Sequence, residues 1–445
     1  MKRIFILFFA VLAMSQLCNA QTPANNPTVH VKVNGSNTGL GTSMFWLDAI
    51  TIDQFLINLY DSLYSGDITV YLAGGDYYYV SLKFWGVPRS VQSISLYGGF
   101  DPTNYSAYGN LPSRDLVTNE TRLHAKNENV IWYEAVGNHH VNGWKTCRVD
   151  GITITSDGSP VDFDALRLVG GDHIISQCKI ENFNTSSWLI WLETGGNHVT
   201  FTNCLFDNNE AGNLMGLASH VDIINTTIAD NDLDYDMFVH YYTYDYNLRN
   251  SIIYGNSNMS MGVGSFDVSN SILSSYEGWV NDMGNNYFGT DPEFTYNTLH
   301  PYTCNTSTSP AIGGGNSMFI LQNSYFEFNI MNYDVINAFR YGSTPLIVDI
   351  GAYQHTPAAN RQKGRSSNTA NSSIRLWANA NTIYVSDLDE QGATLSLYNA
   401  AGQIVYSTPL QADNNTIPLV LNAGTYIARV TDREGKEIVS SKIVI

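Results

Sequence analysis

The chain has 445 residues, of which 14% are charged and 12% are aromatic, and its formal net charge is −18. This acidic balance excludes nucleic acid as a partner, because too few cations are present to neutralise phosphates. It is compatible with binding of cations or neutral sugars, although solubility outside the cell accounts for it without any ligand. The aromatic content and the low charge also exclude a disordered chain, so we predict two or three folded domains.

Residues 1–20 have the features of an export signal. A positively charged start precedes the apolar run Ile4–Ala13, which is too short to span a bilayer, and Cys18–Ala20 offers a signal-peptidase site. A lipoprotein site at Cys18 is disfavoured by Leu17, because such a site needs a small residue just before its cysteine. No second apolar segment of about 18 residues follows. We therefore predict a mature chain that begins at Gln21 and has no transmembrane segment.

The main signal in the mature chain is a repeat. Six segments share an apolar-x-apolar core entered by a small polar residue, and their starts lie about 20 to 26 residues apart, as in solenoid proteins. They are Gly151–Ile154, Gln177–Ile180, Asn203–Phe206, Asn225–Ile228, Asn250–Ile253 and Asn270–Leu273. The period-2 alternation of a strand points two sets of side chains inward. These are Ile152, Cys178, Cys204, Thr226, Ser251 and Ser271, and then Ile154, Ile180, Phe206, Ile228, Ile253 and Leu273.

Stacking explains how such strands become stable. One strand cannot bury an apolar face alone, whereas strands stacked about 4.8 Å apart form continuous interior ladders. We therefore predict an all-β fold dominated by a right-handed parallel β-helix. A Greek-key β-sandwich is the alternative, but its strands recur roughly every 8 to 12 residues, which is about half the spacing seen here.

Turn-forming residues follow the repeated strands. Asn182, Asn208 and Asp230 share one position, and Asn209, Asn231 and Asn256 share the next. Asparagine tolerates the left-handed backbone conformation and bonds its own backbone, so we predict stacked asparagines at a corner of the coil.

The N-terminal end of a solenoid needs a cap, because unpaired strand edges are otherwise exposed. We assign residues 21–125 to this cap and the first coils. A helix is predicted over Ser43–Leu63, ended by Gly66–Asp67, and the first strand at Ile68–Leu72. Residues 126–354 are assigned to the β-helix and its closing coils.

Several motifs in this region resemble exported β-helix proteins of Bacteroidetes-type bacteria. The early-coil motifs are Ser95–Asp101, Ser113–Asp115 and Thr121–Leu123, and the closing motifs are Thr290–Phe294, Ser309–Ile312 and Asp349–Tyr353. Families that end this way are called choice-of-anchor domains, because different surface anchors follow them. Gly313–Asn316 and Asn337–Arg340 depart from the family pattern, which counts against a metal or polar site at that cap.

The last part of the chain has a different character. Residues 355–372 are polar and predict a flexible linker. Residues 373–445 predict a small β-sandwich, with strands at Thr382–Val385, Thr394–Tyr398, Ile417–Leu421 and Tyr426–Val430.

This C-terminal unit resembles the type A sorting domain of the type IX secretion system. The matching motifs are Leu397–Asn399, Gly402–Val405, Ala423–Ile427 and Lys442–Ile445. The resemblance implies export from a didermal bacterium by the type IX machinery, acting through residues 373–445. It further implies removal of the domain, followed by release or attachment to surface lipopolysaccharide.

A catalytic site has to be sought in the β-helix itself, because the motifs of polygalacturonases and pectate lyases are absent. Lys179 and Glu181 point outward from one coil, and Asp207 is expected to stack on Glu181 from the next. Carboxylates about 5 Å apart could hold Ca²⁺ or serve a retaining glycosidase, and a lysine beside them could act as the base of a lyase. The simpler interpretation is that Lys179 relieves repulsion between two carboxylates on a solvated face.

Three further clusters favour structural interpretations. Asp230, Asp232, Asp234 and Asp236 lack the glycine and distal glutamate of a calcium loop, and His173, His198 and His220 lie at unequal offsets from their strands. We therefore predict no metal site. Cys178 and Cys204 are expected as buried neighbours, with the disulfide state of Cys147, Cys178, Cys204 and Cys304 left open.

Aromatic residues give the broadest hint of a ligand. Tyr242, Tyr244 and Tyr246 share one side of the chain if it is extended, and Trp188 and Trp191 lie two coils earlier. Exposed flat rings suit the apolar faces of sugars, whereas stacking inside the coil is the competing explanation. We therefore expect a secreted or surface-displayed module that binds glycans or other surface ligands. The alternative is a polysaccharide lyase or glycosidase acting on an acidic polysaccharide.

Overall fold

The computed structural model describes residues 23–43, 46–103, 114–126, 128–134, 147–242, 244–260, 264–296, 300–304, 308–316, 334–335, 348–354, 375–379, 382–388, 393–398, 403–411, 413–418, 425–433 and 437–444. These residues fall into two compact units, the first ending with 348–354 and the second beginning at 375. The predicted signal peptide and the predicted linker lie outside the described residues. Within the described parts, no helix is long and apolar enough to cross a bilayer.

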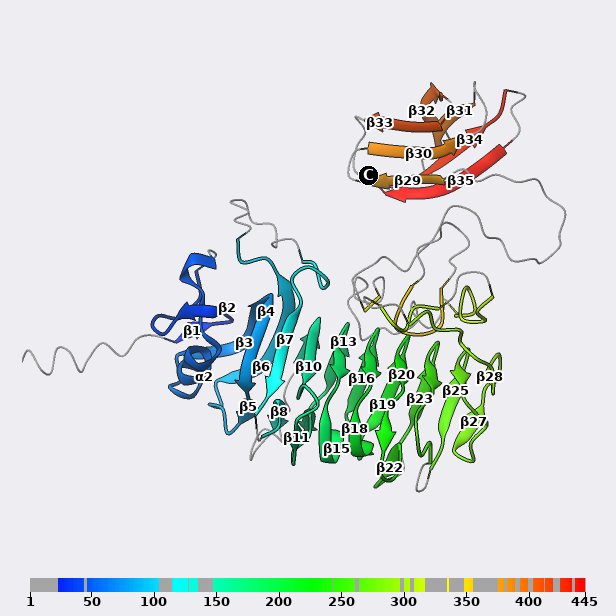
Figure 1. The fold of residues 1–445 in the computed structure, drawn as a ribbon. Coiled ribbons are helices and arrows are strands. Elements are labelled where there is room, and N and C mark those ends of the chain that lie inside the picture. The colour runs from blue at the N-terminus through cyan, green and yellow to red at the C-terminus, as the bar shows by residue number, and fades with distance from the viewer. Residues whose placement is uncertain are drawn as a thin grey trace, which may run out of the picture. The chain divides into compact units, whose positions relative to one another are not determined.

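The first unit is a parallel β-solenoid in which successive turns of the chain add strands to three sheets (Figure 1). The first sheet holds β1 (Ala24–Asn25), β2 (Thr28–Ser36), β3 (Tyr64–Ala73), β6 (Val91–Phe100), β9 (Cys147–Asp150), β13 (His173–Ser176), β16 (His198–Thr202), β19 (His220–Ile224), β23 (Tyr246–Arg249), β25 (Phe266–Ser269) and β27 (Val280–Asp282). The second holds β4 (Gly75–Val80), β7 (Thr121–Ala125), β10 (Ile152–Thr155), β14 (Lys179–Glu181), β17 (Leu205–Asp207), β20 (Thr227–Ala229), β24 (Ile252–Tyr254), β26 (Ile272–Leu273) and β28 (Tyr287–Phe288). The third holds β5 (Leu82–Trp85), β8 (Ile131–Glu134), β11 (Pro160–Val161), β12 (Leu166–Val169), β15 (Asn184–Glu193), β18 (Glu210–Leu217), β21 (Asp232–Leu233) and β22 (Phe238–His240).

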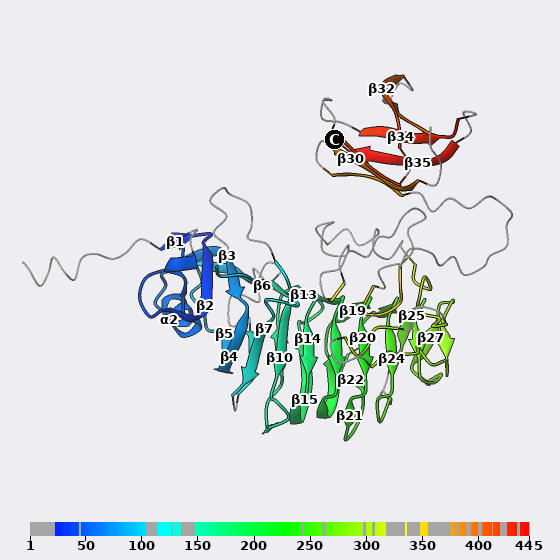
Figure 2. The ribbon, with the colours of Figure 1, turned by 45° about the horizontal axis from the view of Figure 1, so that its top comes forward.

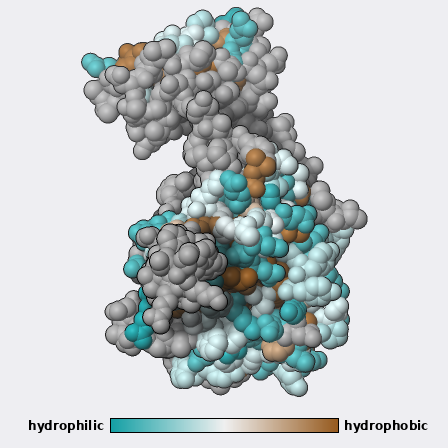
Figure 3. All heavy atoms as spheres, turned by 90° about the vertical axis from the view of Figure 1, so that its left-hand side faces the viewer, coloured by the Kyte–Doolittle hydropathy of each residue, from teal (hydrophilic) through white to brown (hydrophobic). Residues whose placement is uncertain are grey.

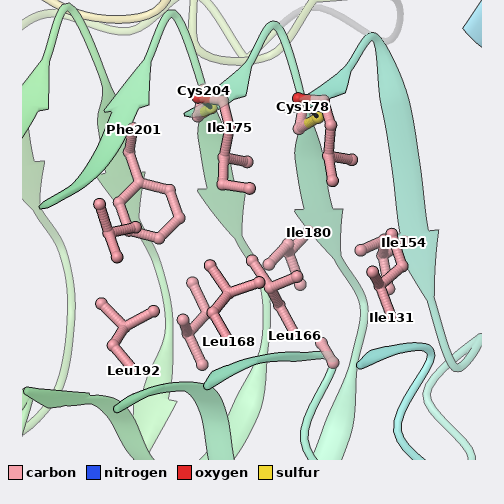
Figure 4. Packing of buried hydrophobic residues seen from close by; sticks show 14 of the residues in the cluster. Ile131, Ile154, Leu166, Leu168, Ile175, Cys178, Ile180, Leu192, Phe201 and Cys204 are labelled. Atoms are coloured by element: carbon pink, nitrogen blue, oxygen red, sulfur yellow. Dashed lines mark hydrogen bonds between the residues drawn. The ribbon is translucent and has the colours of Figure 1, made fainter. Parts of the chain in front are cut away.

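The predicted strand register is confirmed in the second sheet. The ladder runs through Ile154, Ile180, Phe206, Ile228, Ile253 and Leu273, all of which are buried. Cys178 and Cys204 also point inward, at equivalent positions of neighbouring coils (Figure 4). Both are free thiols, and each donates to the carbonyl two residues earlier, as the Thr226 hydroxyl does. The polar ladder is therefore buried without leaving these donors unsatisfied.

The predicted asparagine corners are also confirmed. Left-handed backbone precedes the strands of the second sheet at Gln177, Asn203, Asn225, Asn250 and Asn270, and follows them at Asn182, Asn208 and Asp230. At the next position the side chains form a buried ladder. Asn209 Nδ2 donates to Asn231 Oδ1 at 2.8 Å, and Asn231 Nδ2 donates to Asn256 Oδ1 at 2.7 Å. These residues turn the chain sharply twice per coil, which brackets a short central strand.

The N-terminal cap differs from the prediction in its boundaries. The helix α2 spans only Ile52–Tyr60, after a short 3₁₀ turn η1 (Trp46–Asp48), because Thr51 caps it by accepting a hydrogen bond from the backbone of Gln54. Gly66–Asp67 lies inside β3, and the first sheet already contains β1 and β2, which both pair in parallel with β3. Figure 2 shows α2 at the N-terminal end of the sheets. Seen from that end, the described surface is mostly hydrophilic, with scattered apolar residues (Figure 3).

The early-coil motif has a structural explanation. Gly98 lies so close to the next coil that a Cβ there would be 2.4 Å from the carbonyl oxygen of Gly151. Arg114 donates from Nε to the carbonyl of Gly98 at 2.6 Å and forms an ion pair with the buried carboxylate of Asp150. These contacts explain why glycine and arginine are needed in this motif, without any ligand.

The closing motifs do not form coils over the residues described. Residues 291–296, 300–304, 308–316, 334–335 and 348–354, hereafter the closing segment, pack on the outer face of the second sheet. Gly351 N donates to the carbonyl of Asn250 at 2.7 Å, and Ala352 N donates to Thr227 Oγ1 at 2.9 Å. Leu205, which points outward, is consequently only 1% exposed. The apolar cluster beneath the segment joins Leu205, Ala229, Ile252 and Ile272 to Phe294, Tyr302, Ala311, Val335, Ile350, Ala352 and Tyr353.

The second unit consists of two antiparallel sheets. One holds β29 (Arg375–Asn379), β30 (Thr382–Leu388) and β33 (Asp413–Pro418), and the other holds β31 (Thr394–Tyr398), β32 (Ile404–Pro409), β34 (Thr425–Thr431) and β35 (Glu437–Val444). Both contribute to one core, which includes Ile383, Val385, Leu395, Leu397, Ala428 and Val430. Three predicted strands lie within observed ones, whereas the fourth, Ile417–Leu421, begins in β33 and runs out of the described residues.

Candidate functional site

The structure brings the three predicted catalytic candidates together. Glu181 and Asp207 are register partners on β14 and β17, and Lys179 lies opposite Leu205. All three side chains belong to the outer face of the second sheet, as predicted. The expectation that this face is solvated is wrong, because the closing segment covers the adjoining strands and all three side chains are largely buried.

Ion pairs satisfy the lysine and the glutamate. Lys179 Nζ lies 3.2 Å from Glu120 Oε1, and Arg122 Nη1 lies 2.8 Å from Glu181 Oε1. Arg122 also contacts Glu120, with 3.0 Å between Nη2 and Oε2. Burial opposes ionisation of Glu120, but Lys179 and Arg122 outweigh it and hold the pKa of Glu120 below its usual value. The two cations and two carboxylates therefore compensate one another.

Asp207 takes no part in these ion pairs. The residue is 4% exposed, and burial, followed by the neighbouring carboxylate of Glu181, raises the pKa of Asp207 to about 8. Its Oδ2 accepts a hydrogen bond from Asn208 Nδ2 at 2.9 Å, while Oδ1 has no hydrogen-bond partner among the described residues. Asp207 is therefore mostly protonated at neutral pH.

A tyrosine of the closing segment lies over this carboxyl. Tyr302 Oη accepts from Asn208 Nδ2 at 3.0 Å and donates to Asp230 Oδ2 at 3.1 Å. A neutral carboxyl beside an ionised one is the pair that an acid–base hydrolase needs. However, Asp207 is closed off from substrate in this conformation, and Lys179 is engaged in an ion pair with Glu120. The geometry therefore favours a role in seating the closing segment over one in catalysis, which stays a prediction.

The three predicted ligand-binding tyrosines do not share one side. Tyr242 is 61% exposed, but Tyr246 is 3% exposed and part of the core. Tyr244 packs on the ring of His220, with 4.8 Å between centroids. The observed strand does not include Tyr242 or Tyr244, because β23 begins only at Tyr246, whose hydroxyl donates to the carbonyl of Tyr242 at 2.9 Å. Tyr242 alone keeps the expected exposure.

A different tyrosine completes an aromatic surface on the third sheet. Trp188 and Trp191 of β15 lie 5.3 Å apart, and Tyr241, just after β22, lies 5.1 Å from Trp191 and 6.2 Å from Trp188, measured between ring centroids. These three rings are hereafter the aromatic platform. Gly216 of β18 makes room for them, because a Cβ there would lie 2.5 Å from the ring of Trp191 and 3.4 Å from that of Trp188. Both indoles therefore lie over the surface of the sheet at this glycine.

Charged groups border the platform along the solenoid. Trp191 Nε1 donates to Glu193 Oε2 at 3.2 Å, and the Arg167 guanidinium lies 5.5 Å from the Trp191 ring and 5.6 Å from that of Trp132. Lys83 continues this row, 5.9 Å from the Trp132 ring. The row follows the register of β5, β8, β12 and β15. Sequence reasoning missed it, because these strands lie outside the six repeats, although each carries a charged or aromatic residue between two apolar ones.

The histidines and aspartates do not assemble into a metal site. His198 and His220 stack, with centroids 4.9 Å apart, but His173 pairs with Val199 instead and is buried. Burial lowers the pKa of His173 to about 4, so it is neutral. Among the described residues, no group of three or more histidine, cysteine or acidic side chains is arranged to hold a metal ion, Ca²⁺ included.

No family model matches the sequence, and no curated protein matches it either. The functional interpretation therefore rests on the geometry of the aromatic platform and of the carboxyl cluster.

Proposed function

We propose that this protein is an exported, right-handed β-helix that binds glycans through the aromatic platform on its third sheet. The observation that carries the proposal is the seating of Trp188 and Trp191 over Gly216, with the exposed ring of Tyr241 beside them. Half-buried rings give large, rigid apolar contact area, which suits the C–H faces of pyranose rings.

The charged groups beside the platform supply hydrogen-bond partners, which the aromatic rings lack. Glu193 accepts hydrogen bonds and Arg167 donates them, so hydroxyl groups at the edge of a stacked sugar find both kinds of partner. Binding sites typically combine an apolar surface with a few such polar groups that set orientation. Repetition of this row along the solenoid favours an extended polymer over a single small molecule.

Export and display are part of the same proposal. The right-handed winding follows from the strong preference of crossover connections between parallel strands. The two antiparallel sheets of the second unit and its sequence motifs support a sorting domain that engages the type IX secretion machinery through residues 373–445. The glycan-binding unit would then act as a secreted or outer-membrane surface protein.

A second candidate function is cleavage of an acidic polysaccharide. It is favoured by one observation, the neutral carboxyl of Asp207 next to Glu181, which is ion-paired with Arg122. Release of reducing ends or unsaturated uronates from acidic polysaccharides, lost on Glu181→Gln, would establish this activity. Binding without any turnover supports the first proposal.

A glycan array tests the proposed function. The secreted chain and its Trp191→Ala and Tyr241→Ala variants are compared on the same array, with Tyr235→Ala as the matched control, because Tyr235 is exposed and lies outside the platform. We expect platform variants to lose at least about tenfold in affinity, since removing a ring costs on the order of 1.4 kcal/mol or more. Equal binding by Trp191→Ala and Tyr235→Ala would reject the platform as the site.

A further inference from the structure

A second aromatic surface lies at the N-terminal end of the second sheet. In the pairing of β4 with β7, Tyr77 lies opposite Leu123 and Val80 opposite Ala125, so Tyr78 and Tyr79 share the space opposite a single residue. This β-bulge places both tyrosines at the surface, where Tyr78 is 62% exposed and Tyr79 is 75% exposed. Bulges change the direction in which side chains point and are common next to functional sites.

The backbone of Tyr79 is strained, and the fold gains no packing of its side chain from this strain. Its φ of 59° is in the left-handed region, which a bulky side chain adopts at a cost of roughly 1 kcal/mol or more. Elsewhere the corners of the coils mostly use asparagine, aspartate or glycine for this conformation, as at Asn182 and Gly255, and Gln177 is an exception. Because the ring of Tyr79 is mostly exposed, its burial does not offset the strain of the left-handed backbone. The outlier therefore points to a role for the ring outside the fold.

The neighbouring ring is held rigidly. Tyr78 stacks on His124, with centroids 4.3 Å apart and an angle of 26° between planes. His124 is largely buried, and both its ring nitrogens contact carboxylates: Nε2 lies 2.9 Å from Asp76 Oδ1 and Nδ1 lies 2.7 Å from Asp157 Oδ2. The ring of Tyr78 is thus fixed on one face and open on the other, which lowers the entropy lost when a ligand binds.

The chemistry around the rings selects the ligand. Asp76 and Asp157 are about half exposed, and each uses one oxygen on His124, so both keep capacity to accept hydrogen bonds. Two carboxylates accept from hydroxyl groups but repel uronate and sulfate groups. We propose that Tyr78, Tyr79, Asp76 and Asp157 form a second saccharide site, specific for sugars without acidic groups.

The two surfaces belong to different sheets of the solenoid. The platform lies on the third sheet and the tyrosine pair on the second, so each is able to engage its own glycan chain. If the proposed function holds, the protein is bivalent and cross-links polysaccharide, which raises avidity without new contacts. Bivalency rests on the proposed function, whereas the second site does not.

Calorimetric titration of the secreted chain separates the two sites. The probes are hexasaccharides of neutral β-linked glucan, mannan and xylan, with hexagalacturonate as the acidic comparison. In a Trp191→Ala background, which removes the platform, we expect one remaining site for a neutral probe. Adding Tyr79→Asn should abolish it, while the melting temperature stays equal or rises because asparagine relieves the left-handed backbone. Asp157→Asn should weaken it, and Tyr235→Ala should not.

Other results of the titrations would contradict the tyrosine-pair site, the platform, or both. Loss of all binding in Trp191→Ala rejects the second site but leaves the platform. Unchanged affinity on Tyr79→Asn in the Trp191→Ala background, or equal affinity there for hexagalacturonate, overturns the tyrosine-pair site. Absence of binding to every probe by the unaltered chain counts against both sites.

Discussion

Replacing Asp207 by asparagine should make the protein less sensitive to pH. The ordinary pKa of an aspartate is near 4, whereas burial and the adjacent Glu181 raise the pKa of Asp207 to about 8. The folded state thus binds a proton that the unfolded chain releases. This contribution to stability is fully present below about pH 4 and is lost as the pH rises towards about 8.

The magnitude follows from the linkage between protons and folding. One proton of difference changes the free energy of unfolding by about 1.4 kcal/mol per pH unit, which accumulates to roughly 5–6 kcal/mol across this window. Asparagine has nearly the same shape and no charge to bury, so Asp207→Asn should recover much of this loss at pH 8. The hydrogen bond from Asn208 to the side-chain oxygen can be kept.

Urea titrations at pH 5, 6, 7 and 8, followed by tryptophan fluorescence, measure the effect. Other groups also titrate in this range, so the informative quantity is the difference between Asp207→Asn and the unaltered protein. Asp234→Asn serves as the matched control, because Asp234 is exposed. We expect the difference to grow in favour of Asp207→Asn as the pH rises. A difference that stays constant from pH 5 to pH 8 would refute a buried, protonated Asp207.

Phe206→Ala should cost about 3–5 kcal/mol in urea titrations, because Phe206 is fully buried in the ladder. Leu205→Ala should also cost about 2–4 kcal/mol, since the closing segment buries its outward side chain. A negligible loss for Leu205→Ala would show that the segment does not dock there. Intact-mass measurement of surface-extracted protein should give a chain that starts at Gln21 and ends between His355 and Ser373. A chain that retains Ile445 would contradict the sorting-domain interpretation.

The solenoid was predictable because its signals are local and repeated. Each coil contains an alternating apolar pair and a corner residue that tolerates left-handed backbone, so Ile180 and Asn182 together define the register of their coil. Six copies of this pattern leave little freedom for another arrangement. The same reasoning placed Glu181 beside Asp207, which the structure confirms.

The surroundings of the candidate sites were not predictable in this way. Burial of Leu205 and Asp207 depends on Tyr302 and its neighbours, which lie about a hundred residues away and carry no repeating pattern. Tyr246 was misplaced because alternation was extended across a turn, beyond the strand that begins at that residue. The role of Gly216 was invisible, since a glycine in a strand shows its purpose only through the rings above it.

The most direct test of glycan binding at the platform displaces its Trp191 ring without removing it. Gly216→Ala introduces a Cβ 2.5 Å from the ring of Trp191, so this indole must shift while every aromatic residue is kept. The measurement is the dissociation constant for the strongest array ligand, by calorimetry, in Gly216→Ala and in the control Tyr235→Ala. We predict at least about tenfold weaker binding for Gly216→Ala and no change for Tyr235→Ala. Unchanged affinity in Gly216→Ala would contradict recognition by the platform.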